Sequence, residues 1–134
     1  MRVVDLQIEW GLIIDDDETS RYVMRQAVRQ LGCETEEAVN GLDGLALAYR
    51  DLPELILLDL RMPGIDGITV LQHLGDDART ANIPVIIVTS SELSDVERTR
   101  LDRTAAVLSK SSFSAQTLAS VLPRKLQPAG TRHH

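Results

Sequence analysis

Cysteine is nearly absent from this sequence of 134 residues, in which Cys33 stands alone. A single cysteine cannot form an internal disulfide, which argues against a disulfide-stabilised secreted domain and favours a reducing, cytoplasmic location. Aromatic residues make up only 3% of the chain, so the core must be aliphatic. We expect Cys33 to be a small apolar residue near the start of a strand.

Positive charge and long apolar runs are scarce as well. The net charge of −6 argues against a nucleic-acid surface, which normally carries a basic patch. No apolar run is long enough to span a bilayer and no signal-peptide pattern opens the chain, so we expect no membrane partner. The remaining composition, 43% hydrophobic and 25% charged, is ordinary for a globular protein.

The length fits one domain with a single sizeable core. We expect a lead-in over residues 1–8, one folded domain over residues 9–126, and a tail over residues 127–134. The tail resembles an expression-tag remnant, so His133 and His134 are not counted as metal ligands.

Short apolar runs alternate with segments of helical periodicity along the domain. Gly32, Pro53 and Pro123 mark the ends of helical segments, and Asp17 and Asp66 can cap helix starts. The expected strands are 9–14, 33–39, 55–58, 84–89 and 105–109, and the expected helices are 18–31, 42–50, 67–74, 94–103 and 114–122. Five such strand–helix pairs predict an α/β fold with a parallel sheet and helices on both faces.

Acidic residues follow two of the expected strands. Asp15 and Asp16 end the first strand and Asp59 ends the buried run Leu55–Leu58. Ligands of such sheets bind outside the carboxyl ends of the strands. Three carboxylates gathered there cannot all stay ionised without a cation, so the pattern predicts a site for Mg²⁺, with Mn²⁺ as an alternative.

Two further strand ends carry Thr89, followed by Ser90, and Lys110. Together with the acids they suit a phosphoryl group: a carboxylate oxygen of Asp59 can attack phosphorus, Lys110 can pair with a phosphoryl oxygen, and Thr89 can donate a hydrogen bond. Ser90 is small and leaves room for the incoming group. In this arrangement Asp16 and Asp59 bind Mg²⁺ directly, and Asp15 holds a metal-bound water.

Taken singly, each of these residues has a plainer interpretation. Asp17 fits the cap of the next helix, and His73 fits a surface position on its helix. Lys110 alone would be an ordinary surface lysine, and Thr89 an ordinary strand residue. Their joint occurrence at four strand ends favours the functional interpretation.

The sequence closely resembles the receiver domain of two-component response regulators, the CheY-like family. The motifs that carry the resemblance are LIIDDDETSR (12–21), LLDLRMPGIDG (57–67), VIIVTS (85–90) and VLSK (107–110). The resemblance covers residues 9–126 and implies a doubly wound (βα)5 domain with strand order 2-1-3-4-5.

The resemblance also implies roles for individual residues. Asp59 would be phosphorylated by a histidine kinase or a histidine phosphotransfer protein, with Mg²⁺ held by Asp15, Asp16, Asp59 and the backbone carbonyl of Arg61. Thr89 and Lys110 would contact the phosphoryl group and couple it to a conformational change. The family's usual contact surface, a homodimer interface in some members, corresponds here to residues 94–122.

The sequence departs from the family in three places. Ser111 replaces the proline that usually follows the lysine, so we expect a trans Lys110–Ser111 peptide. Val107 replaces the aromatic switch residue. Arg61 and Ser91 occupy the positions thought to tune the lifetime of the phosphoryl group, and we expect the Arg61 side chain at the surface.

Two other functions stay open. A Mg²⁺-dependent phosphatase that forms an aspartyl phosphate would need a second acid two residues after its nucleophile, where this chain has Arg61. A degenerate receiver that only binds proteins would not need a complete acidic pocket. We therefore expect a signalling domain, and not an enzyme acting on other molecules.

Overall fold

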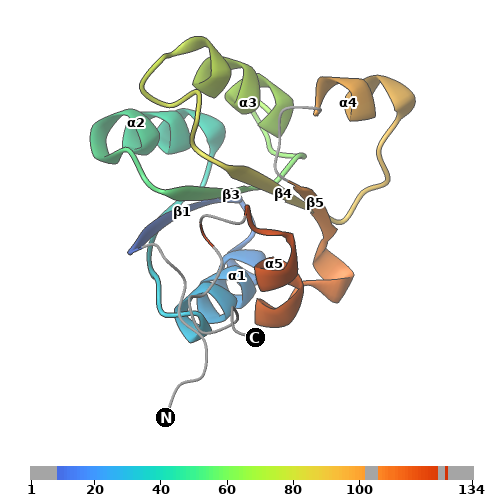
Figure 1. Cartoon of the computed structure of the whole chain (residues 1–134). Coiled ribbons are helices and arrows are strands. Elements are labelled where there is room, and N and C mark those ends of the chain that lie inside the picture. Colours follow the sequence, from blue (N-terminus) through green and yellow to red (C-terminus); the bar gives the residue numbers. More distant parts are fainter. Residues whose placement is uncertain (1–8, 102–105, 124–125, 127–134) are drawn as a thin grey trace.

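A computed structural model describes residues 9–101, 106–123 and 126 of the chain. Strands and helices alternate throughout (Figure 1). In chain order the elements are β1 (Trp10–Ile14), α1 (Glu18–Gln30), β2 (Glu34–Ala38), α2 (Gly41–Asp51), β3 (Leu55–Leu58), α3 (Gly67–Asp76), β4 (Val85–Thr89), α4 (Asp95–Arg100), β5 (Ala106–Ser109) and α5 (Ala115–Val121), with a 3-10 turn, η1 (Lys110–Ser112), between the last two.

All five strands form one parallel sheet of order β2-β1-β3-β4-β5. The central strands β3 and β4 are buried along their whole length, which explains their uninterrupted aliphatic sequences. The two edge strands, β2 and β5, are only partly buried. The expected fold class and strand order are thus confirmed.

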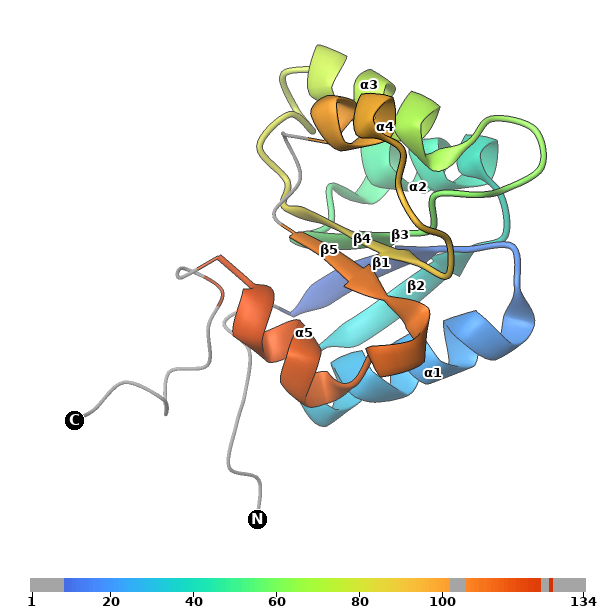
Figure 2. The same ribbon diagram turned by 90° about the vertical axis from the view of Figure 1, so that its right-hand side faces the viewer.

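The helices divide between the two faces of the sheet. Helices α1 and α5 cover one face, and α2, α3 and α4 lie on the other (Figures 1 and 2). Alternate residues of each central strand supply the two cores, so Leu57 belongs to the same core as Met24 and Leu118, and Leu58 to the same core as Ala48 and Val70. The sheet is therefore held from both sides, with all its carboxyl ends at one edge.

The sequence predicted most element boundaries to within a residue or two. Helix α4 ends at Arg100, before the expected end at residue 103. Residues 102 and 103 of the expected helix lie outside the described residues. The first residue of the expected fifth strand, the lead-in 1–8 and the tail 127–134 lie outside them too. Within the described part of the chain, no helix combines the length and apolarity needed to cross a bilayer.

Candidate functional site: an acidic pocket with a lysine

Asp59 follows β3 directly and is 4% exposed. Its backbone N–H donates to Ile14 O at 2.9 Å, which extends the β1–β3 pairing by one residue into the site. The residue at the start of α3 must be glycine, because a Cβ on Gly67 would lie 2.4 Å from Asp59 O. Close packing of α3 against the end of β3 therefore fixes the backbone that carries Asp59.

Asp15 and Asp16 follow β1, beside β3. Asp15 is completely buried whereas Asp16 is exposed. Asp15 Oδ1 accepts a hydrogen bond from the N–H of Asp17 at 2.9 Å, and Asp17 in turn caps α1 by accepting from Ser20 N–H at 2.8 Å. The capping role expected for Asp17 is confirmed, and the tight turn aims the Asp15 carboxylate back into the pocket.

Lys110, the first residue of η1, brings a positive charge to these acids. Its Nζ lies 2.9 Å from Asp15 Oδ2 and 3.6 Å from Asp59 Oδ1. Burial lowers the pKa of Lys110, but the hydrogen bond and charge of Asp15, followed by those of Asp59, outweigh burial and raise it overall. Lys110 therefore stays protonated and supplies a positive charge to the pocket.

The electrostatics of the pocket raise the pKa of Asp59 to about 6. Burial is the largest cause and the negative charge of Asp15 comes next, while Lys110 and the backbone N–H of Arg61 act in the opposite direction. Asp59 is consequently ionised at neutral pH, but at a free-energy cost that an additional cation would relieve.

The pocket fits a divalent cation. Carboxylate oxygens of Asp15, Asp16 and Asp59 lie within 4.8 Å of one another, and Lys110 can balance only one of the three charges. Asp15 Oδ2 is buried, and the group that meets it is the Lys110 ammonium at 2.9 Å. Hard oxygen ligands of this kind, some buried and one open to water, suit Mg²⁺, which keeps part of its hydration shell.

The next strand contributes Thr89, Ser90 and Ser91. Thr89 is buried at the end of β4, and its hydroxyl accepts a hydrogen bond from Ser91 N–H at 3.2 Å. Ser90 is exposed and Ser91 is partly buried. The carboxyl ends of β1, β3, β4 and β5 thus carry the acids, the threonine and the lysine, as the sequence predicted.

Arg61 lies two residues beyond Asp59 and is exposed, as expected. Its guanidinium forms an ion pair with Glu97 of α4 and donates a hydrogen bond to Glu92 O at 3.4 Å. The Lys110–Ser111 peptide is trans, since the described residues contain no cis bond. Val107 is 40% exposed on β5, in the position where the family usually has an aromatic ring.

Several plainer expectations are also confirmed. His73 is exposed, and Cys33 is buried just before β2. Burial raises the pKa of the Cys33 thiol to about 12, with smaller contributions from Glu54 and Glu34, so it stays protonated.

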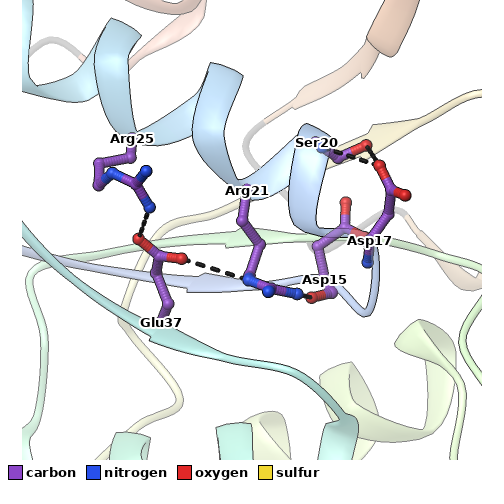
Figure 3. Close-up of polar contacts among 6 residues, drawn as sticks. All are labelled: Asp15, Asp17, Ser20, Arg21, Arg25 and Glu37. Atoms are coloured by element: carbon purple, nitrogen blue, oxygen red, sulfur yellow. Dashed lines mark hydrogen bonds and ion pairs between the residues drawn. The ribbon is translucent and has the colours of Figure 1, made fainter.

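The contacts of two residues near the pocket, Arg21 and Glu97, were not predicted from the sequence. Arg21 of α1 donates to Asp15 O at 2.9 Å, and Glu97 holds Arg61 (Figure 3 shows the Arg21 contact). Arg21 lies four residues after Asp17, so its helix could be predicted. Its second partner, Glu37 on β2, is sixteen residues away, and no local pattern indicates such a pair.

Comparison with known proteins agrees with this geometry. The response regulator receiver domain family matches residues 12–122. The polar-differentiation response regulator DivK of Brucella anthropi is 37% identical over 100 residues, which cover 74% of this chain and 81% of DivK. Protein PilH of Pseudomonas aeruginosa is 41% identical over 81 residues, which cover 60% of this chain and 67% of PilH.

Some relatives are much longer than this chain. The transcriptional regulator RpaA of Synechocystis is 44% identical over 79 residues, which cover 59% of this chain and 33% of RpaA. The match to the response regulator PleD of Caulobacter vibrioides covers only 17% of that protein.

Solved structures show the same fold. The chemotaxis protein CheY4 of Vibrio cholerae superposes with a TM-score of 0.78 at 24% identity, covering 89% of this chain and 99% of that one. With the acidic pocket and Lys110 assembled at the carboxyl edge of a 2-1-3-4-5 sheet, the chain belongs to the response regulator receiver domains, the signalling modules of two-component systems.

Proposed function

We propose that this domain is a phosphoacceptor whose Asp59 takes a phosphoryl group from a phosphohistidine on a histidine kinase or a histidine phosphotransfer protein. The observation that carries the proposal is the pocket itself. Carboxylate oxygens of Asp15, Asp16 and Asp59 lie within 4.8 Å of one another, and Lys110 Nζ lies 3.6 Å from the Asp59 carboxylate.

In the transfer step an oxygen of the ionised Asp59 carboxylate attacks phosphorus. The bond from phosphorus to the histidine nitrogen breaks and its electron pair stays on that nitrogen, which leaves an acyl phosphate on Asp59. Water attack on the same phosphorus later breaks the bond to Asp59 and releases inorganic phosphate. Although the pKa of Asp59 is raised, its value of about 6 still lies below neutral pH, so Asp59 is ionised and therefore nucleophilic.

The surrounding residues hold the reacting group. Mg²⁺ or Mn²⁺, bound by Asp15, Asp16, Asp59 and the backbone carbonyl of Arg61, would neutralise charge on the transferring phosphoryl oxygens. Lys110, which lies 2.9 Å from Asp15 Oδ2 and 3.6 Å from Asp59 Oδ1, would turn from them toward a phosphoryl oxygen.

Three residues at the end of β4 are assigned further roles. Thr89 and Ser90 would contact the phosphoryl group, with the Thr89 hydroxyl exchanging its Ser91 N–H partner for a phosphoryl oxygen. Ser91, with Arg61 across the pocket, would tune the lifetime of the phosphoryl group by controlling the approach of water.

Asp59 phosphorylation would change how the domain binds its partners. The face built by α4, β5 and α5 is where we expect this change to be read, and a homodimer through that face stays a prediction. Its exposed apolar side chains include Val96 and Val107.

The decisive experiment is incubation with acetyl phosphate and Mg²⁺, followed by intact-mass measurement. We expect one added phosphoryl group in the wild-type chain, none in Asp59→Asn, and none when EDTA replaces Mg²⁺. Asp17→Asn is a matched control, because Asn can also cap α1, and it should label like wild type.

Two other outcomes would contradict the proposal. No labelling of the folded wild-type chain would favour a domain that only binds proteins. Continuous hydrolysis of phosphate monoesters, as distinct from the acetyl phosphate used for labelling, would favour a phosphatase.

A further inference from the structure

Arg21 joins the acidic pocket to the edge strand β2. One terminal nitrogen of its guanidinium donates to the backbone carbonyl of Asp15 at 2.9 Å, and its Nε donates to Glu37 Oε1 at 3.2 Å. The two side chains of this ion pair are only 14% and 24% exposed. Figure 3 shows the guanidinium between the β2 carboxylate and the loop that follows β1.

The contact completes the backbone hydrogen bonding of Asp15. Its N–H donates to Ala38 O at 3.1 Å and its carbonyl accepts from Arg21, so both polar groups of its backbone are fixed. The Asp15 carbonyl belongs to the peptide plane that leads into Asp16. Holding this carbonyl therefore fixes the direction from which both Asp15 and Asp16 project.

Glu37 in turn is fixed from both sides. Its second carboxylate oxygen forms an ion pair with Arg25, one helical turn beyond Arg21, and its backbone pairs with Ile13 of β1. Arg25 contacts Glu37 and the Tyr22 ring and lies over β2, away from the Asp15 carbonyl (Figure 3). Arg21 and Arg25 therefore carry the same charge and share one carboxylate, but only Arg21 reaches the pocket.

We propose that Arg21 is a positioning residue for the cation site, holding the Asp15–Asp16 peptide so that both carboxylates face one divalent ion. The inference rests on the proposed function, because it needs a bound cation to act on. Losing an outer residue that orients a metal ligand typically weakens metal binding by about 10-fold to 100-fold.

An effect of charge alone would change the Mg²⁺ affinity in the opposite direction. The positive charge of an arginine offsets part of the negative charge of the site, so an arginine that acted only through its charge would weaken cation binding. Its replacement by alanine would then tighten the binding of Mg²⁺. A purely structural arginine would lower the stability of the fold without a specific change in Mg²⁺ affinity.

The test is calorimetric titration of the whole chain with Mg²⁺ at neutral pH, in wild type, Arg21→Ala and Arg25→Ala. We expect the Kd for Mg²⁺ to rise about 10-fold to 100-fold in Arg21→Ala. In Arg25→Ala it should stay within about threefold of wild type or fall slightly. Labelling with acetyl phosphate at saturating Mg²⁺ should approach the wild-type rate in Arg21→Ala, which shows that the deficit lies in cation binding.

Equal Mg²⁺ affinity in wild type and folded Arg21→Ala would overturn the inference and leave the proposed function intact. A wild-type chain that binds no Mg²⁺ would overturn both. If Arg21→Ala does not fold, Arg21→Lys replaces it. Lysine keeps the charge but lacks the planar fork that reaches Asp15 O and Glu37 together, so weaker binding than wild type supports the inference and equal binding contradicts it.

Discussion

Helices α1 and α4 flank the same pocket but are anchored in different ways. Helix α1 has 13 residues, of which Met24, Ala27 and Val28 are buried, and its Arg21 donates a hydrogen bond to the backbone carbonyl of Asp15. Helix α4 has six residues and none of them is buried. A capping box at Ser94 and the ion pair from Glu97 to Arg61 hold its first turn.

This difference separates two tasks of the domain. The β1–α1–β2 side fixes the carboxylates of Asp15 and Asp16, so movement there would disturb the proposed cation site. On the α4 side the helix itself buries no residue, and its first turn is held by surface polar contacts, which are individually weak, while Leu101 directly after the helix is 4% exposed in the core. A charge added at Asp59 can therefore displace α4 at low cost, and we expect α4 to change most on phosphorylation.

The largest expected effect compares the two helices directly. Met24→Ala removes a side chain that is 1% exposed and should lower the free energy of unfolding by about 2–5 kcal/mol. Val96→Ala truncates an α4 side chain that is 63% exposed and should change it by less than about 0.5 kcal/mol. Urea denaturation measures both, and similar losses would show that α4 is anchored as firmly as α1.

The second effect concerns the charge of Asp59. Its pKa is raised from 3.8 to about 6, so between these values the native state holds a proton that the unfolded chain has released. Stability from this group is therefore fully present below about pH 3.8 and is lost as the pH rises toward 6. The loss amounts to at most about 3 kcal/mol, because one pKa unit corresponds to about 1.4 kcal/mol.

Asp59→Asn removes this penalty. In EDTA at pH 7 it should be more stable than wild type by up to about 3 kcal/mol, and the difference should shrink as the pH falls toward 4. Asp16→Asn serves as the control. It removes an exposed carboxylate that raises the pKa of Asp59 less than burial and Asp15 do, so most of the pH dependence should remain. Denaturation curves at several pH values measure the effect, and a difference that does not vary with pH would contradict this origin.

Sequence reasoning succeeded where a property repeats along the chain. The fully buried strands β3 and β4 are aliphatic at every position, and the caps Asp17 and Asp66 stand directly before their helices. Parallel strands then bring their carboxyl ends to one edge, so the members of the pocket could be predicted from strand ends alone.

It failed where one side chain meets another from a distant segment. The Arg61 side chain was expected at the surface, but the identity of its acidic partner Glu97, 36 residues away, depends on how α4 is placed. The Arg21 contact likewise depends on the pairing of β1 with β2. Such pairs follow from tertiary packing, which neither periodicity nor composition encodes.

A smaller effect tests the ion pair that links Arg61, two residues beyond Asp59, to Glu97 of α4. Glu97→Gln keeps a side chain that can complete the capping box but removes the charge that holds Arg61. Backbone amides of α4 should exchange hydrogen roughly twofold to fivefold faster, while those of α1 stay unchanged. Asp95→Asn removes a charge from the same turn and is the control; equal acceleration in both variants would argue that the ion pair has no specific role.

The smallest expected effect is at Val107. This side chain is 40% exposed on the edge strand β5 and carries no ring that could rotate inward, so we expect the signal to leave through α4 and not through this position. Val107→Ala should change stability by less than about 0.5 kcal/mol, leave Asp59 labelling intact, and preserve the change in α4 amide exchange on phosphorylation.

Val88→Ala, on the adjacent strand but fully buried, should cost more than about 1 kcal/mol. If Val107→Ala instead abolished the exchange response of α4 while Asp59 still became phosphorylated, β5 would be the route of the signal, and the contrast between the two helices would not explain how it leaves the pocket.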